Sequence, residues 1–345
     1  MKKKNILKTL VCSAVIVPCL FGLTACFGGG NSATIEEFND AKYNALVALN
    51  TTEKYDEFTN YTYLNTYSTV LEYEGRYEYK ENESDSDTVT KVHLNKYSTE
   101  VTSSYARYGK GDNTVIKYSL TKEEKRTYYS VETNLTLKKN EENTVTETVY
   151  YVGKVGTGTD AQYYAIEQIT ITKKGVLDED NSTKKYEIFP DQERYKSIIE
   201  FMSTSVNHKL ASVITSNFTL QGVLTMGAMP NESITKDGNT ISSKIDFSGC
   251  TVTEVGSSSS VPMLIKGEQE IFISGDKFVE VSNNVSYKQF SPEKQITISN
   301  NINQDIEMIY SSESITLPAI NSNYIEEEDL IERVAGAPFF HVSME

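Results

Sequence analysis

The side chain with the clearest potential for chemistry is the thiol of Cys26, which directly follows an apolar segment at the start of the chain. Several lysines precede this segment, and Pro18 and Gly22 interrupt it. A basic start, a short apolar core and small residues before a cleavage point are typical of an export signal. A retained membrane-spanning helix is the alternative, but it needs about 20 consecutive apolar residues. We therefore expect residues 1–25 to be a signal peptide that is removed.

The run Leu23-Thr24-Ala25-Cys26 resembles the lipobox of bacterial lipoproteins. The resemblance implies that the Cys26 thiol receives a diacylglyceryl group and that the peptide is cut between Ala25 and Cys26. Two or more acyl chains hold a protein stably on a membrane. The resemblance thus implies a lipoprotein anchored to the outer side of a bacterial cell membrane through diacylglyceryl-Cys26. The glycine-rich residues 26–33 then form a flexible tether.

Histidine and cysteine, the usual residues of metal and nucleophile sites, are sparse and scattered. The histidines are His93, His208 and His341, and none has a cysteine or acidic partner at the spacing of a zinc site. Once the signal peptide is removed and Cys26 carries lipid, Cys250 is the one remaining thiol, so no intramolecular disulfide is expected. As a nucleophile it would need a nearby histidine, and a small buried hydrophobe is its more common role.

Two loops have part of the composition of ligand-binding loops. Residues 153–159 are glycine-rich, but they lack the order G-x-x-x-x-G-K-[ST] of a phosphate loop, so a hairpin turn is favoured. Residues 178–182 begin like a calcium loop, yet Thr183 stands where such a loop needs glycine and Phe189 where it needs glutamate. We therefore predict no catalytic, metal-binding or cofactor-binding residues, and no enzymatic activity.

The charge balance excludes nucleic acid as a partner. The 345 residues include 33 lysines and arginines and 48 acidic residues, for a net charge of −15. Loss of the lysine-bearing signal peptide makes the mature chain more acidic still. Binding to nucleic acid requires clustered basic side chains. An acidic surface instead suits a soluble body held outside the cell by its lipid.

The spacing of apolar residues predicts two helices, each followed by a series of strands. A helix with an apolar stripe is expected over 33–50, capped by Thr34, and a second from Pro190 to about Asn207. From residue 72 to 80, charged side chains alternate with tyrosine and glycine, which indicates a strand with one aromatic and one wet face. The first set of further strands is expected at Val89–Tyr97, Val101–Tyr108, Thr114–Leu120, Arg126–Leu137, Thr144–Val152, Gln162–Lys173 and Lys184–Phe189. The second set is expected at Leu210–Leu224, Ser233–Lys236, Thr240–Phe247, Thr251–Val255, Met263–Ile273, Lys277–Val281, Val285–Gln289, Gln295–Ser299 and Asp305–Tyr310.

This order of elements resembles the LolA-like half-barrel lipoproteins, including a late extended segment that ends in Leu317-Pro318. We expect an α+β fold, with a large antiparallel curved sheet and two or three helices packed on its concave face. The β-rich domain would cover residues 34–325, either as one sheet or as two similar halves, 34–189 and 190–325. Residues 326–345 are expected to form an acidic C-terminal tail, within which a short helix reaching Val334 is an alternative.

Two non-enzymatic functions follow from these observations. The family resemblance implies binding or carriage of a lipid or another hydrophobic ligand between sheet and helices. The alternative is a surface adhesion or scaffold module that binds a glycan or a protein through tyrosine-rich sheet faces, because the chain contains 23 tyrosines. Tyrosine also has a high strand propensity, so the same stripe of Tyr73, Tyr77 and Tyr79 can serve only to fill a half-buried sheet.

Overall fold

The computed structural model describes residues 33–50, 60–156, 160–189, 191–215, 231–248, 251–252, 263–275, 277–291 and 296–340. The expected signal peptide with Ala25, the expected lipid anchor Cys26 and all of the expected tether except Ala33 lie outside these ranges.

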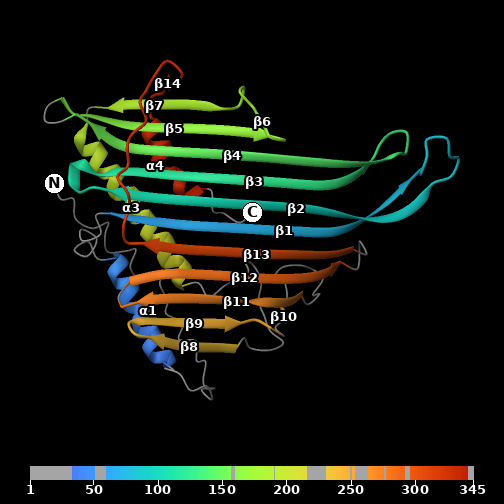
Figure 1. Cartoon of the computed structure of the whole chain (residues 1–345), viewed down its shortest axis with the longest axis horizontal. Helices are drawn as coiled ribbons and strands as arrows, with labels where there is room; N and C mark the ends of the chain where they lie inside the picture. The colour runs from blue at the N-terminus through green and yellow to red at the C-terminus, as the bar shows by residue number, and fades with distance from the viewer. Residues whose placement is uncertain are drawn as a thin grey trace, which may run out of the picture.

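One large sheet of fourteen strands dominates the described chain (Figure 1). Its strand order is β14-β7-β5-β4-β3-β2-β1-β13-β12-β11-β9-β8, with β6 beside β5 and β10 beside β11. All named pairs are antiparallel except β14 with β7. The strands are β1 (Tyr61–Tyr79), β2 (Val89–Tyr108), β3 (Val115–Val131), β4 (Leu137–Val155), β5 (Gln162–Lys173), β6 (Val176–Leu177), β7 (Thr183–Phe189), β8 (Asn231–Asp237), β9 (Thr240–Asp246), β10 (Thr251–Val252), β11 (Met263–Ser274), β12 (Lys277–Ser291), β13 (Ile296–Ile309) and β14 (Ile325–Glu326).

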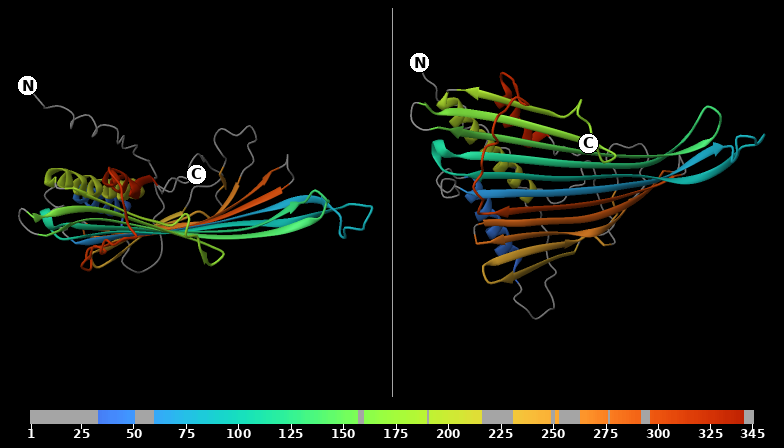
Figure 2. Two further views of the ribbon diagram at one scale, coloured as in Figure 1. Left: turned by 90° about the horizontal axis from the view of Figure 1, so that it is seen from above. Right: turned by 45° about the horizontal axis from the view of Figure 1, so that its top comes forward.

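Within the described residues, three α-helices lie on one side of this sheet, near one end of its long strands (Figure 2). They are α1 (Ile35–Asn50), α3 (Gln192–Thr215) and α4 (Leu330–Phe340), and a single 3-10 turn, η1 (Gly111–Asn113), precedes β3. We call this face of the sheet the helix side. The expected large antiparallel sheet is confirmed, and the described chain is more strongly β than the expected α+β class.

Thr34 caps the first helix, as its sequence predicts, and forms a capping box with Glu37. The backbone N–H of Glu37 donates to the Thr34 hydroxyl oxygen at 3.2 Å, and the Glu37 carboxylate accepts from the Thr34 N–H at 2.8 Å. Phe38 and Ala45 are buried on the stripe that faces the sheet. The helix therefore packs across the strands of the C-terminal half, including β9, β11 and β12.

The second helix corrects one strand prediction. A strand is expected at Leu210–Leu224, but α3 continues to Thr215, and residues 216–224 lie outside the described ranges. The α3 residues Met202 and Val206 are buried in the core. Residues 210–215 are therefore helical although they include the β-branched Val213, Ile214 and Thr215, since strand propensity depends strongly on context.

Strand β1 joins the two halves of the chain into one sheet. It pairs with β2 on one side and with β13 on the other, in register from Thr62 opposite Ile309 to Tyr73 opposite Ile298. The strands of residues 34–189 and those of 190–325 therefore belong to one continuous sheet.

The core lies between the helices and the sheet at what we call the covered end. Residues directly opposite each other in the ladders share a face, so one row of side chains crosses the sheet under the helices. Tyr61 and Tyr105 stack there with ring centroids 5.9 Å apart, and Tyr163 lies 4.5 Å from Tyr195 of α3. All four rings are at most 3% exposed. Tyrosine rings therefore pack in this core beside aliphatic side chains such as Ile116 and Val152.

The C-terminal segment wraps around one edge of the sheet. After β13 the chain crosses the side opposite the helices, where Leu317 lies so close to Gly153 that a Cβ there would meet its methyl carbons at 2.9 Å. Strand β14 then pairs with β7 at the edge, and α4 returns on the helix side. Leu330, Ile331 and Val334 of α4 are at most 1% exposed. The expected acidic tail, residues 326–345, thus contains a helix that completes the core.

Candidate functional site

Within the described residues, the structure does not bring together the side chains that the sequence singles out for chemistry. Cys250 and His341 lie outside the described residues, together with Ala25 and Cys26. In the glycine-rich loop, β4 continues to Val155 and residues 157–159 are not described. In the acidic loop, Asp178 forms an ion pair with Lys173 at 2.8 Å and accepts hydrogen bonds from Asn181. That loop is a self-contained turn.

The described part of the chain has neither a metal-binding cluster nor a membrane-spanning helix. Its residues contain no cluster of three or more histidine, cysteine, aspartate or glutamate side chains that could hold a metal ion. Among the described helices, none has both the length and the apolar character needed to cross a membrane.

The most distinctive surface lies at the distal end of β1 to β4, where these strands extend beyond the helices (Figure 1). We define the distal aromatic surface by six rings, those of Tyr73, Tyr77, Tyr79, His93, Tyr97 and Tyr129. Alternate residues of a strand share one face, so Tyr73, Tyr77 and Tyr79 lie on the same side as the core residue Tyr63. The rings of β1, and those of β2 that share their register, are therefore on the helix side of the sheet, beyond the part that the helices cover. Tyr129 of β3 joins them through its ring contacts with Tyr77 and His93.

The six rings contact one another across strands. Tyr73 and Tyr97 stack with centroids 5.8 Å apart and planes 8° apart, and their hydroxyl oxygens are 3.3 Å from each other. The His93 ring lies 4.6 Å from Tyr129, and its Nε2 is 3.2 Å from the Tyr79 hydroxyl oxygen. Except for Tyr79, which is buried, each ring is partly exposed. The rings thus form two neighbouring groups, Tyr73 with Tyr97, and Tyr77 and Tyr79 with His93 and Tyr129, on one partly exposed aromatic surface.

The buried side chain of Asn95 connects the strands that carry these rings. Its side chain is fully buried, and its Oδ1 accepts hydrogen bonds at 3.0 Å from both the Tyr77 hydroxyl and the Tyr129 backbone N–H. The ladder between β2 and β3 ends at the pair Lys96 and Thr127, and Asn95 is the next residue of β2 towards the distal end. The Asn95 amide thus takes the place of a backbone acceptor where the two strands separate.

The Tyr73 hydroxyl is a neutral hydrogen-bonding group at physiological pH. The hydrogen bond with Tyr97, together with partial burial, raises the pKa of Tyr73 to about 12. The opposite side of the same strands carries charge instead, as in the ion pair between Glu72 and Lys96 at 3.0 Å. The distal sheet therefore has one aromatic and one charged face, as the alternation in residues 72–80 predicts.

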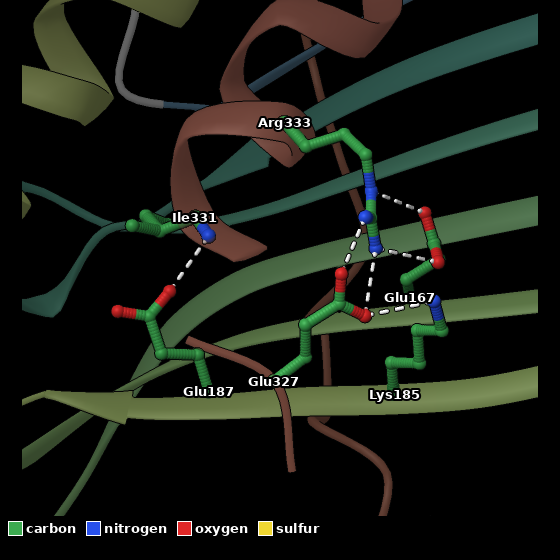
Figure 3. A network of polar contacts seen from close by, with 6 residues as sticks. All are labelled: Glu167, Lys185, Glu187, Glu327, Ile331 and Arg333. Carbon is green, nitrogen blue, oxygen red and sulfur yellow. Dashed lines mark hydrogen bonds and ion pairs between the residues drawn. The ribbon is translucent and has the colours of Figure 1, made fainter. Parts of the chain in front are cut away.

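A second polar constellation fixes the C-terminal wrap to the sheet (Figure 3). Arg333 of α4 donates to both carboxylate oxygens of Glu167, at 3.2 and 3.0 Å, and to Glu327 at 2.7 Å. Lys185 also pairs with Glu327 at 2.8 Å. The Glu167 side chain is only 4% exposed. Because each charge has a partner within the chain, this network is a structural clamp.

Glu187 extends the clamp to the start of α4. One of its carboxylate oxygens accepts from the backbone N–H of Ile331 at 2.8 Å, and the other from Arg194 of α3 at 3.1 Å. An acceptor at a helix N-terminus satisfies a donor that the helix itself leaves unpaired. Glu187 therefore ties α3 and α4 to the same strand, β7.

Comparisons with known proteins do not assign the chain to a family. No family model and no curated protein matches the sequence. Among solved structures, the translocator domain of the autotransporter NalP from Neisseria meningitidis aligns over 79% of this chain and 96% of its own, at 9% identity and a TM-score of 0.19. The transport unit of the autotransporter AIDA-I from Escherichia coli aligns over 79% and 98%, at 10% identity and a TM-score of 0.13. TM-scores this low do not establish a common fold.

Sequence reasoning found part of the distal aromatic surface. The period-two alternation singles out Tyr73, Tyr77 and Tyr79, and the three share one face. It did not find Asn95 or Tyr129, since their contribution depends on how β2 and β3 pair and separate. No local pattern in the sequence encodes that pairing.

Proposed function

We propose that this chain is a lipid-anchored extracytoplasmic binding protein without enzymatic activity, held at the bacterial cell surface through Cys26. The lipobox-like run that ends in Cys26 and the glycine-rich residues after it support the anchor. An N-terminal lipid and a short tether leave the β-rich body free to face outward.

We further propose that the distal aromatic surface binds a glycan. The observation that carries this proposal is a row of partly exposed rings, several with hydroxyl groups, on a part of the sheet that the helices leave open. Tyrosine combines an apolar face with a polar tip, which suits the apolar faces and the hydroxyl groups of a sugar ring. Aromatic cross-strand pairs also stabilise a sheet. Stacked ring pairs would be enough to stabilise the sheet, whereas a binding surface also requires that the rings are accessible to a ligand.

A glycan array tests this proposal. We expect the wild-type chain to bind a subset of oligosaccharides, and the Tyr73→Ala and Tyr97→Ala variants to lose that signal by about tenfold or more. Glu72→Ala, on the charged face of the same strand, is the matched control and should bind like the wild type. An empty array, or equal binding by the ring variants, would contradict the proposal. In that case, capture of a protein by the wild-type chain but not by the Tyr73→Ala and Tyr97→Ala variants would favour a protein partner.

The second candidate is a hydrophobic ligand enclosed between sheet and helices, as in a half-barrel whose concave face carries the helices. The placement of α1, α3 and α4 on one side of the sheet favours it (Figure 2). Native mass spectrometry of the chain after removal of its own anchor would show a bound amphiphile. If no bound amphiphile is found, this candidate is wrong, and the glycan proposal is unaffected.

The anchor has its own test. Globomycin, which blocks the signal peptidase of lipoproteins, should make the precursor accumulate, and Cys26→Ser should release the chain from the membrane fraction. Normal processing in the presence of globomycin would show that the lipobox assignment is wrong.

A further inference from the structure

The two edges of the sheet differ in how they are protected. At one edge, β14 pairs with Lys185 and Tyr186 of β7, and the N–H of Glu327 donates to the Tyr186 carbonyl at 2.9 Å, so the C-terminal wrap covers the middle of that strand. At the other edge, β8 ends the strand order, and within the described residues it pairs only with β9. Six of its seven residues are exposed. An open edge strand is a template for adding another strand.

The turn after β8 determines which backbone groups point outward. Asp237 pairs with Thr240 across the two-residue turn at Gly238 and Asn239, where Gly238 has φ +57°. In such a hairpin the closing pair is hydrogen-bonded, and hydrogen-bonded pairs alternate along an antiparallel ladder. The N–H and C=O groups of Glu232, Ile234 and Lys236 therefore face away from β9. These groups are the ones that an added strand would meet.

The sequence of β8 is complementary to itself. In an antiparallel pair of two β8 strands centred on Ile234, Glu232 of one copy lies opposite Lys236 of the other, and the reverse pair repeats by symmetry. All three outward-facing residues then form hydrogen-bonded pairs in the same register. Opposite charges directly across strands are favourable, whereas like charges are not. The charges of Glu232 and Lys236 therefore favour pairing with a second copy of β8 in this one register.

We propose that β8 is a homodimer interface, through which two copies of this chain pair antiparallel about Ile234 and extend the sheet. The contact is isologous, because the same strand is used by both copies and closes after two. It is independent of the glycan proposal, since β8 lies far across the sheet order from β1 and β2.

Sedimentation velocity on the full chain in detergent is the first measurement. The wild type should show a concentration-dependent dimer. Ile234→Pro removes only an outward-facing N–H and should leave the chain monomeric, because a proline is tolerated on an edge strand when its nitrogen faces solvent. Circular dichroism like that of the wild type would show that the fold is kept. A monomeric wild type, or a dimer that survives Ile234→Pro, would overturn the proposal.

Charge reversal tests the register. Glu232→Lys and Lys236→Glu each place like charges opposite each other and should each raise the dimer Kd by about tenfold or more. A mixture of the two variants should form heterodimers, because both cross-strand pairs between positions 232 and 236 then join a lysine to a glutamate. Glu37→Gln removes the ion pair that Lys236 forms with α1 at 3.5 Å and serves as the control that leaves the dimer unchanged. Failure of the mixture to pair would exclude this register.

A cross-link provides a direct distance check. Opposed residues of a hydrogen-bonded pair have Cα atoms about 5.5 Å apart, within the range of a disulfide. Ile234→Cys should therefore cross-link to itself on oxidation to a larger extent than the wild type. Ser233→Cys, whose counterpart is displaced along the partner strand, should stay at the wild-type level. Equal cross-linking at both positions would contradict the pairing.

Discussion

Asn95 of β2 connects β1 and β3 at the distal end of the sheet. It is fully buried, and one oxygen serves two donors from two different strands, β1 and β3. Nothing in the local sequence distinguishes it from the exposed asparagines of the turns. Its role follows from the point at which the β2–β3 ladder ends, which explains why sequence reasoning could identify the tyrosines but not the residue that positions them.

Asn95→Ala should destabilise the protein, because it leaves the Tyr77 hydroxyl and the Tyr129 N–H without this acceptor. We expect a loss of about 1–3 kcal/mol in the free energy of unfolding, measured by urea denaturation. Asn303→Ala, at an exposed position of β13, should change stability by less than about 0.5 kcal/mol. Equal effects of the two substitutions would show that Asn95 has no special role.

Arg333→Met should lower the free energy of unfolding for a different reason. It leaves the buried carboxylate of Glu167 without its cationic partner, and breaking such a pair costs about 3 kcal/mol when one partner stays buried. The double variant Arg333→Met with Glu167→Gln should recover most of this loss in urea denaturation. Arg126→Met, which removes an exposed pair with Glu124, should cost less than about 1 kcal/mol. A double variant no more stable than Arg333→Met would contradict this account of the clamp.

The clamp should also weaken in acid. Hydrogen bonds from Arg333, and then from Lys185, lower the pKa of Glu327 from its usual 4.5 to about 2. Because the folded-state pKa lies below the unfolded one, this stabilisation is complete above about pH 5 and is lost as the pH falls towards 2. Amide exchange in α4 should accelerate over this range. In Glu327→Gln this part of the pH dependence should vanish, and its persistence would assign the effect to another group.

At the scale of elements, sequence patterns predicted the kind of element better than its extent. The helix at 33–50 and the strand Gln162–Lys173 were predicted closely, because each has a clear apolar period. Residues 138–143 were expected to be a connection, but they lie within β4. At the distal end both faces of the sheet contact water, so a polar run can form a strand without any apolar period.

Strand β11 requires glycine at position 267. Its φ is +128°, and a Cβ there would lie 1.9 Å from the backbone oxygen of Asn284 on β12. Gly267→Ala should therefore lower the free energy of unfolding by about 2–4 kcal/mol, through backbone strain and overpacking. Gly275→Ala, in a turn with φ +63° and open space around it, should cost about 1 kcal/mol. Similar costs in urea denaturation would show that the close approach to β12 is unimportant.

At the scale of the whole molecule, the decisive feature is the pairing of β1 with β13, which join residues more than 200 positions apart in the chain. Sequence reasoning left open whether the strands form one sheet or two, because pairing between distant strands has no local signature. It also did not foresee that the C-terminal residues would wrap around an edge.

The central claim is that a ligand binds on the helix side of the distal sheet. Hydrogen–deuterium exchange of the chain with and without an oligosaccharide from the array tests it most directly. We predict slower exchange in the peptides that contain Tyr73–Tyr79 and His93–Tyr97, with little change in α1 and α3. Protection confined to the helices and the covered end, with none at the distal strands, would contradict the claim.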